Sequence, residues 1–122
     1  MANKVQVNDK GAQVITLDTT GAVVIHNSFG SSKIGSWKLQ VVVGGGSPGS
    51  FVIKQRLHGS GLTGSNWIST LYYNEATTTV PSAGDPVTAN GLYVVVCDQC
   101  DVQLDYTSGA NGMTVYARPY NG

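Results

Sequence analysis

The sequence predicts an all-β protein, a single antiparallel β-sandwich of the jelly-roll kind. No segment sustains a helical period. Short runs rich in Val, Ile, Thr and Tyr recur at intervals of about ten to fifteen residues, as strands do. Sixteen glycines, with clusters of Ser and Thr, separate these runs and supply the turns. A jelly roll wraps its strands around one core and so protects the sheet edges.

The runs predict nine strands, and the chain length predicts one domain. The strands are expected at residues 13–17, 22–26, 37–43, 51–57, 67–74, 86–88, 92–97, 101–107 and 113–118. A chain of 122 residues is long enough to bury one core. The sandwich domain is expected over residues 13–122. Residues 1–12 are polar, and we expect them to form an arm that orders only against a neighbouring molecule.

The charge content is low and balanced. Charged residues make up 11% of the chain, against about 25% in an average globular protein. Seven basic and seven acidic residues give a net charge of zero, which argues against nucleic acid or an anionic membrane as partner. A neutral surface rich in Ser, Thr, Asn and Gly suits a component of an assembly. No apolar run is long enough for a signal peptide or a membrane span, so we expect folding in a cytoplasm.

The stretch WKLQVVV-GGGSPGS-FVIKQRL predicts a hairpin with one apolar face. Pairing Val43 with Phe51 places Val41 opposite Ile53 on that face. Side chains alternate along a strand, so the other face gathers Lys38, Gln40, Val42, Val52, Lys54 and Arg56. This basic stripe is either a solvated outer face or a contact patch for an acidic partner.

The stretch VVVCDQCDVQL contains both cysteines. A two-residue turn at Asp98 and Gln99 would place Cys97 opposite Cys100. The same register directs Tyr93, Val95, Cys97, Cys100, Val102 and Leu104 to the core. We therefore interpret the cysteines as thiols that pack as small hydrophobes. A disulfide between them in an oxidising medium is the alternative.

Metal and redox chemistry find little support in the sequence. A zinc site needs two further ligands, and His26 and His58 lie at the ends of different predicted strands. A redox dithiol needs a helix N-terminus, which is not predicted here. Asp98, Asp101 and Asp105 are too few oxygen ligands for calcium. We expect no bound metal and no cofactor.

Two short sequence patterns that occur in the functional motifs of enzymes are also present. Residues 45–49 fit G-x-S-x-G and residues 59–64 fit G-x-G-x-x-G, but each motif requires a helix to follow, and strand-like sequence follows here. We therefore expect no catalytic residues and no enzymatic activity.

Three stretches of the second half share a pattern: GSGLTGSNWISTLYYNE, VTANGLYVVV and CDVQLDYTSGANGMTVYARP. Over roughly residues 51 to 119 this pattern resembles that of small β-sandwich virion proteins of tailed bacteriophages, which decorate or cement the capsid or form head fibres and tail appendages. Where such proteins usually have a glycine-containing turn, this chain has Cys97-Asp98-Gln99-Cys100.

The resemblance implies a non-enzymatic virion component, assembled in the cytoplasm of a host bacterium. Its implied partners are the major capsid protein and further copies of itself, in a dimer or trimer. The residues that we expect to contact the capsid are Asn3, Lys4, Gln6, Asn8, Asp9, Lys10, Lys38, Lys54, Arg56, Arg118, Tyr120 and Asn121.

Two other functions are compatible with the sequence. Jelly rolls host many lectins, so a carbohydrate-binding or receptor-binding appendage could use the aromatic residues Trp37, Trp67, Tyr72, Tyr73 and Tyr93. Alternation places Trp67 and Tyr73 on one face and Tyr72 on the other, so no row of three aromatic rings is expected. The second alternative is a jelly-roll subunit that assembles into a shell or filament by itself.

Overall fold

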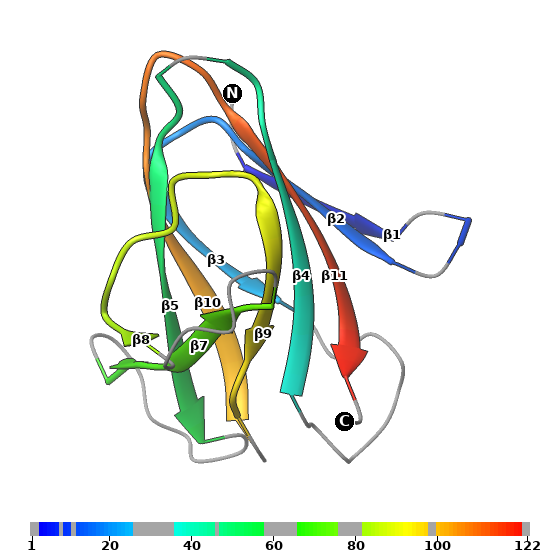
Figure 1. The fold of residues 1–122 in the computed structure, drawn as a ribbon, viewed down its shortest axis with the longest axis vertical. Coiled ribbons are helices and arrows are strands. Elements are labelled where there is room, and N and C mark those ends of the chain that lie inside the picture. Colours follow the sequence, from blue (N-terminus) through cyan, green and yellow to red (C-terminus); the bar gives the residue numbers. More distant parts are fainter. Residues whose placement is uncertain are drawn as a thin grey trace.

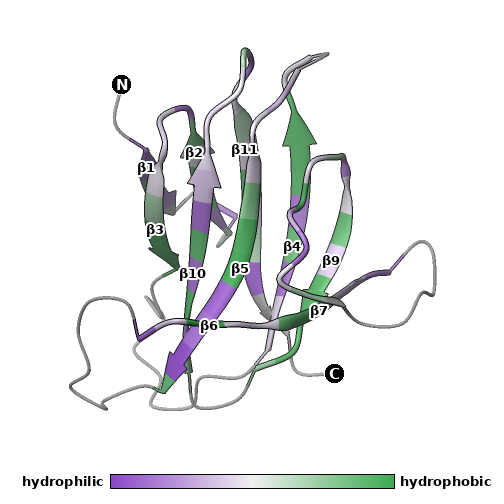
Figure 2. Cartoon of the chain, turned by 90° about the vertical axis from the view of Figure 1, so that its left-hand side faces the viewer, coloured by the Kyte–Doolittle hydropathy of each residue, from purple (hydrophilic) through white to green (hydrophobic). Residues whose placement is uncertain are grey.

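The protein is a β-sandwich of two antiparallel sheets that pack face to face (Figures 1 and 2). The computed structural model describes residues 3–7, 9–10, 12–25, 36–45, 47–57, 66–75, 82–97 and 100–120. These residues form strands, turns and connections and contain no helix, so none of them belongs to a helix that could span a membrane. The predicted all-β fold class is confirmed.

One sheet has seven strands, in the order β1-β2-β11-β4-β9-β7-β8, and the other has four, in the order β3-β10-β5-β6. The strands are β1 (Lys4–Val7), β2 (Gln13–Leu17), β3 (Gly21–Ile25), β4 (Ser36–Val43), β5 (Ser50–Leu57), β6 (Ile68–Ser69), β7 (Leu71–Asn74), β8 (Ser82–Ala83), β9 (Gly91–Val95), β10 (Cys100–Thr107) and β11 (Met113–Tyr120).

Eight of these strands have the jelly-roll order. The seven-stranded sheet contains the row β2-β11-β4-β9, and the other sheet is β3-β10-β5-β6. The chain therefore changes sheet between β2 and β3, β3 and β4, β4 and β5, β6 and β7, β9 and β10, and β10 and β11. Strands that neighbour each other in sequence mostly face each other across the core, as in two wrapped Greek keys.

The connection from β4 to β5 and the connection from β10 to β11 both cross between the sheets, and they lie side by side at one end of the sandwich, at the top of Figure 1. The amide of Gly44, just after β4, donates to the carbonyl of Gly112, just before β11, at 3.1 Å. The amide of Asn111 donates to the carbonyl of Ser47 at 3.0 Å, and the amide of Gly49 donates to the carbonyl of Asn111 at 3.3 Å. These bonds satisfy backbone groups where the ladders end.

The core lies between the sheets, and every second residue of the strands points into it. Its largest fully buried side chains include Tyr106 and Phe51 of the four-stranded sheet and Ile15, Leu39 and Met113 of the seven-stranded sheet. Each of these residues stands at the inward position of an alternating pattern, so the sequence period places it there.

Both predicted hairpins are wrong, because each joins strands of different sheets. β4 pairs with β11 and β9, whereas β5 pairs with β10 and β6. Val43 lies opposite Met113 and Phe51 opposite Tyr106, not opposite each other. Likewise β9 and β10 lie in different sheets, so Cys97 and Cys100 flank a crossing between the sheets.

The predicted inward direction of the cysteine segment is nevertheless confirmed. Tyr93, Val95 and Cys97 are buried, as are Val102 and Leu104. Cys100 is half-buried and packs against the core, and neither cysteine forms a disulfide. His26, His58, Asp98 and Gln99 lie outside the described residues.

The predicted N-terminal arm is wrong for residues 4–7, which form β1 and pair with β2 of the same chain. Lys4 lies opposite Thr16 and Gln6 opposite Val14, while Val5 packs against the core. Polar and apolar residues alternate here with the period of a strand, so the segment orders on its own chain.

The predicted strand over residues 67–74 is two short strands in different sheets. Thr70 separates β6 from β7; it is buried, and its amide donates to the carbonyl of Ile53 at 2.9 Å. Of the predicted strand at residues 86–88, only Val87 pairs, through two backbone hydrogen bonds with Phe51.

Candidate interaction surface

The two outer faces of the sandwich differ in chemistry. The outer face of the four-stranded sheet, here called the charged face, carries Val52, Lys54 and Arg56 from β5 and Asp101, Gln103 and Asp105 from β10. In Figure 2 the purple segments of β10 and of the second half of β5 mark hydrophilic residues. Lys54 Nζ lies 2.9 Å from Asp105 Oδ2. The Arg56 guanidinium lies 4.1 Å from the centre of the Trp67 ring, and Asp101 stands opposite Arg56 on β10. Positive and negative groups thus stand beside each other on the charged face.

The outer face of the seven-stranded sheet, here called the apolar face, exposes more large hydrophobic side chains than the charged face does. Among the described residues, seven large hydrophobic side chains are exposed, and five of them lie on this face: Val42, Leu71, Leu92, Val96 and Tyr116. The other two, Leu57 and Ile68, belong to the four-stranded sheet. Exposed apolar side chains that gather on one face are typical of surfaces that bind another molecule, which makes this face the candidate interaction surface.

The strand register arranges the apolar face in three rows. Because residues directly opposite each other in a ladder share a face, the partners can be read across the sheet. The rows are Lys4-Thr16-Thr114-Val42, Gln6-Val14-Tyr116-Gln40-Leu92 and Arg118-Lys38-Val94-Tyr73. Three cations, Lys4, Lys38 and Arg118, therefore stand among neutral and apolar side chains.

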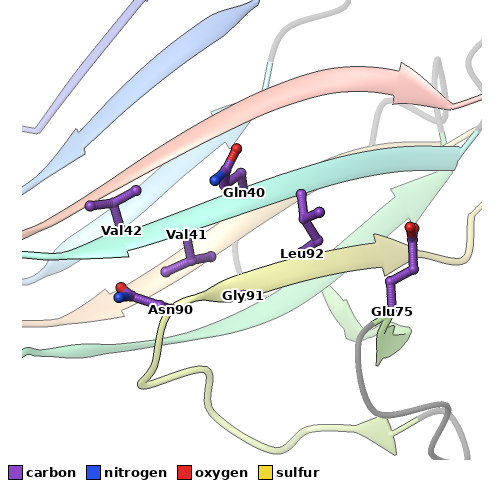
Figure 3. Close-up of a pocket in the computed structure, with 7 residues that line it drawn as sticks. All are labelled: Gln40, Val41, Val42, Glu75, Asn90, Gly91 and Leu92. Atoms are coloured by element: carbon purple, nitrogen blue, oxygen red, sulfur yellow. The ribbon is translucent and has the colours of Figure 1, made fainter.

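An ion pair crosses the apolar face above β9. Lys38 Nζ on β4 lies 2.9 Å from Oε2 of Glu75, the residue after β7, and β9 runs between them. Figure 3 shows Gln40, Val42, Leu92 and Glu75 on the same side of the β4–β9 pair, with Val41 pointing away from it. Val94, which stands between Lys38 and Tyr73, is only 3% exposed although it points outward.

A shallow pocket of about 290 Å³ lies on the apolar face, lined by Ala12, Lys38, Gln40, Leu92, Tyr116 and Arg118. A neighbouring hollow, shown in Figure 3, extends along β4 and β9 to Asn90 and Glu75. The Asn90 carboxamide oxygen accepts a hydrogen bond from the amide of Val43 at 2.8 Å, which holds the start of β9 against the end of β4.

The structure brings together some of the predicted contact residues and separates others. Lys4, Gln6, Lys38 and Arg118 share the apolar face, and Tyr120 pairs with Ser36 at the end of β11. Lys54 and Arg56 lie on the charged face, so the predicted basic stripe with Lys38 does not exist. Asn3 bonds the turn after β2, because its carboxamide oxygen accepts from the amides of Asp18 and Thr19.

The other predicted contact residues add less. Asp9 and Lys10 are exposed in the turn between β1 and β2, while Asn8 and Asn121 lie outside the described residues. Sequence reasoning missed Tyr116, Leu92, Leu71 and Val96 as members of one surface. Alternation with the inward residues Tyr93, Val95 and Cys97 marks Leu92 and Val96 as outward, but the strand order that joins them to Tyr116 and Leu71 is not visible in the sequence.

The apolar face is suited to binding by contact. Apolar side chains at its centre offer area to bury, and the cations offer charged hydrogen-bond donors. Among the described residues, no three His, Cys, Asp or Glu side chains are grouped as they would be to hold a metal ion. The glycine-rich residues 44–45 and 47–49 are the crossing between β4 and β5, which leads into a strand; residues 59–64 lie outside the described residues.

No protein-family model, curated protein or solved structure matches this chain.

Proposed function

We propose that the protein is a structural, non-enzymatic component of a tailed-bacteriophage virion, which decorates the capsid by binding the major capsid protein as a small homo-oligomer. The observation that carries the proposal is the difference between the two outer faces. One face places its charges beside each other, whereas the other exposes five large hydrophobic side chains to solvent. A protein with one such face is suited to lying on a larger surface. The resemblance of residues 51 to 119 to phage virion proteins is the reason for proposing that this larger surface is a phage capsid.

The mechanism is physical. A protein bound between neighbouring capsid subunits adds an interface, which in stable complexes buries about 1,200 to 2,000 Å² in total. Because the bound protein stabilises the assembled shell and not the separated subunits, mass action shifts the equilibrium toward the shell. An expanded shell is selected if the docking surface on the capsid protein exists only in that geometry.

The test uses expanded capsid shells of the phage that encodes this chain, assembled without it. Purified protein is added at saturating concentration, and binding is measured by co-sedimentation and shell melting by calorimetry. We expect stoichiometric binding and a higher melting temperature of the shell. Sedimentation of the protein alone should give a dimer or trimer. Shells that neither bind the protein nor melt at a higher temperature would rule out capsid decoration.

A carbohydrate-binding appendage is the second candidate, favoured by one observation. The Tyr116 ring is exposed beside the pocket that Gln40, Lys38 and Arg118 line, a combination of stacking surface and polar groups that suits a sugar. Of the other aromatic candidates, Trp37, Tyr72 and Tyr93 are buried, Trp67 is covered by Arg56, and Tyr73 is half-buried on the apolar face. Binding to a glycan array that Tyr116→Ala abolishes would favour this candidate over capsid decoration.

A further inference from the structure

We infer that the apolar face is the surface that docks on the capsid, and that the partner surface offers a carboxylate to the pocket between Lys38 and Arg118. This inference rests on the function proposed above and names the chemistry of its partner. The apolar face holds the largest group of exposed hydrophobic side chains among the described residues, so it gains most from burial.

The apolar face carries an excess of positive charge. Lys4, Lys38 and Arg118 face outward, and Glu75 is the one carboxylate placed among them by a described contact. Glu75 pairs with Lys38, whereas Lys4 and Arg118 have no ion-pair partner among the described residues. A partner surface that complements this face must therefore be acidic.

Arg118 and Lys38 stand directly opposite each other on β11 and β4. Like charges at opposite positions of a ladder repel, and Glu75 offsets this only in part, because it pairs with Lys38 and leaves Arg118 without an ion-pair partner among the described residues. A carboxylate placed between them would relieve this repulsion and would accept charge-assisted hydrogen bonds from both groups. The isolated protein thus holds an arrangement that an acidic ligand would stabilise.

The pocket is built for such a group. Its wall combines the cationic Lys38 and Arg118 with the amide of Gln40 and the apolar Ala12, Leu92 and Tyr116. Apolar neighbours exclude water when a partner closes over the pocket, and a charged hydrogen bond then strengthens. A Glu or Asp side chain at the centre of an apolar partner surface meets these requirements.

A second copy of this chain does not fit the apolar face as well. A two-fold contact would bring the face against itself, and hence three cations and one carboxylate against the same set, so that two surfaces with an excess of positive charge would meet. The charged face of another copy offers carboxylates that already stand beside cations, since Asp105 binds Lys54 and Asp101 lies opposite Arg56. Charge complementarity therefore favours an acidic capsid protein over self-association at this surface.

The experiment compares two variants that each lower the net charge by one. Arg118→Gln removes a cation from the apolar face, and Gln103→Glu adds a carboxylate to the charged face. Both are tested on the expanded shells, with affinity measured at several salt concentrations. We expect Arg118→Gln to weaken binding about tenfold or more and to flatten the salt dependence, and Gln103→Glu to bind like the wild type. Unchanged melting of each purified variant confirms that it folds.

The outcomes separate this inference from the proposed function. If the wild type binds the shells and the two variants bind equally well, the docking surface is elsewhere and capsid decoration stands. If the wild type does not bind, both proposals fail. If Tyr116→Lys converts an oligomer of the isolated protein to a monomer, the apolar face binds a second copy, and the acidic partner is overturned.

Discussion

Tyr72 of β7 and Tyr93 of β9 meet edge to face on the inner side of the seven-stranded sheet, with ring centroids 6.0 Å apart and an angle of 63° between the rings. Both hydroxyls bond the connection that leads into β9. The Tyr72 hydroxyl donates to the carbonyl of Asp85 at 2.7 Å, and the Tyr93 hydroxyl donates to that of Ala89 at 3.1 Å. The pair therefore fastens this connection to the sheet.

Stability should fall at alkaline pH because of this pair. Burial raises the pKa of both hydroxyls above 10.0, and for Tyr72 the charge of Asp85 and then Tyr93 add to the effect. Between the unfolded-state and folded-state pKa values the unfolded chain binds fewer protons, so the free energy of unfolding falls as pH rises. The contribution is complete below about pH 10 and is lost as pH rises through the folded-state pKa.

Urea unfolding from about pH 8 to about pH 11 measures this decline, and absorbance of tyrosinate follows the ionisation. The double variant Tyr72→Phe/Tyr93→Phe lacks both hydroxyls, so its stability should decline less steeply over the same range. An equally steep decline in the double variant would assign the alkaline loss of stability to other groups.

Two tyrosine-to-phenylalanine changes should have opposite effects on stability. Tyr106 is 1% exposed, and its hydroxyl has no hydrogen-bond partner among the described residues. An unsatisfied buried hydroxyl costs about 1–3 kcal/mol, so Tyr106→Phe should raise the free energy of unfolding. Tyr72→Phe deletes a made hydrogen bond and should lower it by about 0.5–1.5 kcal/mol. Urea unfolding at neutral pH compares both, and a loss of stability in Tyr106→Phe would show that its hydroxyl is bonded.

The face of each strand could be predicted from the sequence, but the strand partners could not. Alternation is a local property, and it correctly directs Val95 and Val102 inward. Partners depend on which sheet a strand joins, and in a jelly roll neighbouring strands of the sequence enter different sheets. Lys38 and Lys54 illustrate the consequence, because both point outward but from opposite sides of the sandwich.

The candidate site was therefore only partly predictable. Lys38 and Arg118 stood out as basic residues, but the ladder that makes them neighbours joins positions 38 and 118, far apart in the sequence. No local pattern encodes such a pairing. The short β1 was missed for another reason, since Lys4 and Gln6 made the segment appear polar although Val5 packs against the core.

The exposed ion pair between Lys38 and Glu75 should contribute little to stability. Both side chains are more than a third exposed, at 36% and 41%, so water screens their attraction. Glu75→Gln should lower the free energy of unfolding by less than about 1 kcal/mol, and added salt should shrink the difference. Parallel urea titrations at low and high salt provide the measurement. A salt-independent loss above this limit would show that Glu75 has a structural role beyond the ion pair.

The crossing between β4 and β5 should not tolerate a side chain at Gly49. A Cβ added there would collide with the Thr107 carbonyl oxygen and would lie 2.5 Å from the Tyr106 hydroxyl. Because this carbonyl belongs to the backbone of β10, it cannot move away as a side chain could. The β4–β5 connection and the end of β10 would therefore have to move apart. Gly49→Ala should lower the free energy of unfolding by about 1–3 kcal/mol, as overpacking does. Gly44→Ala, in the same crossing, is the control, because its added Cβ would meet the Gly112 carbonyl oxygen at 3.3 Å and should cost much less. If the two variants unfold at the same urea concentration, the close approach of β10 to Gly49 is not present in solution.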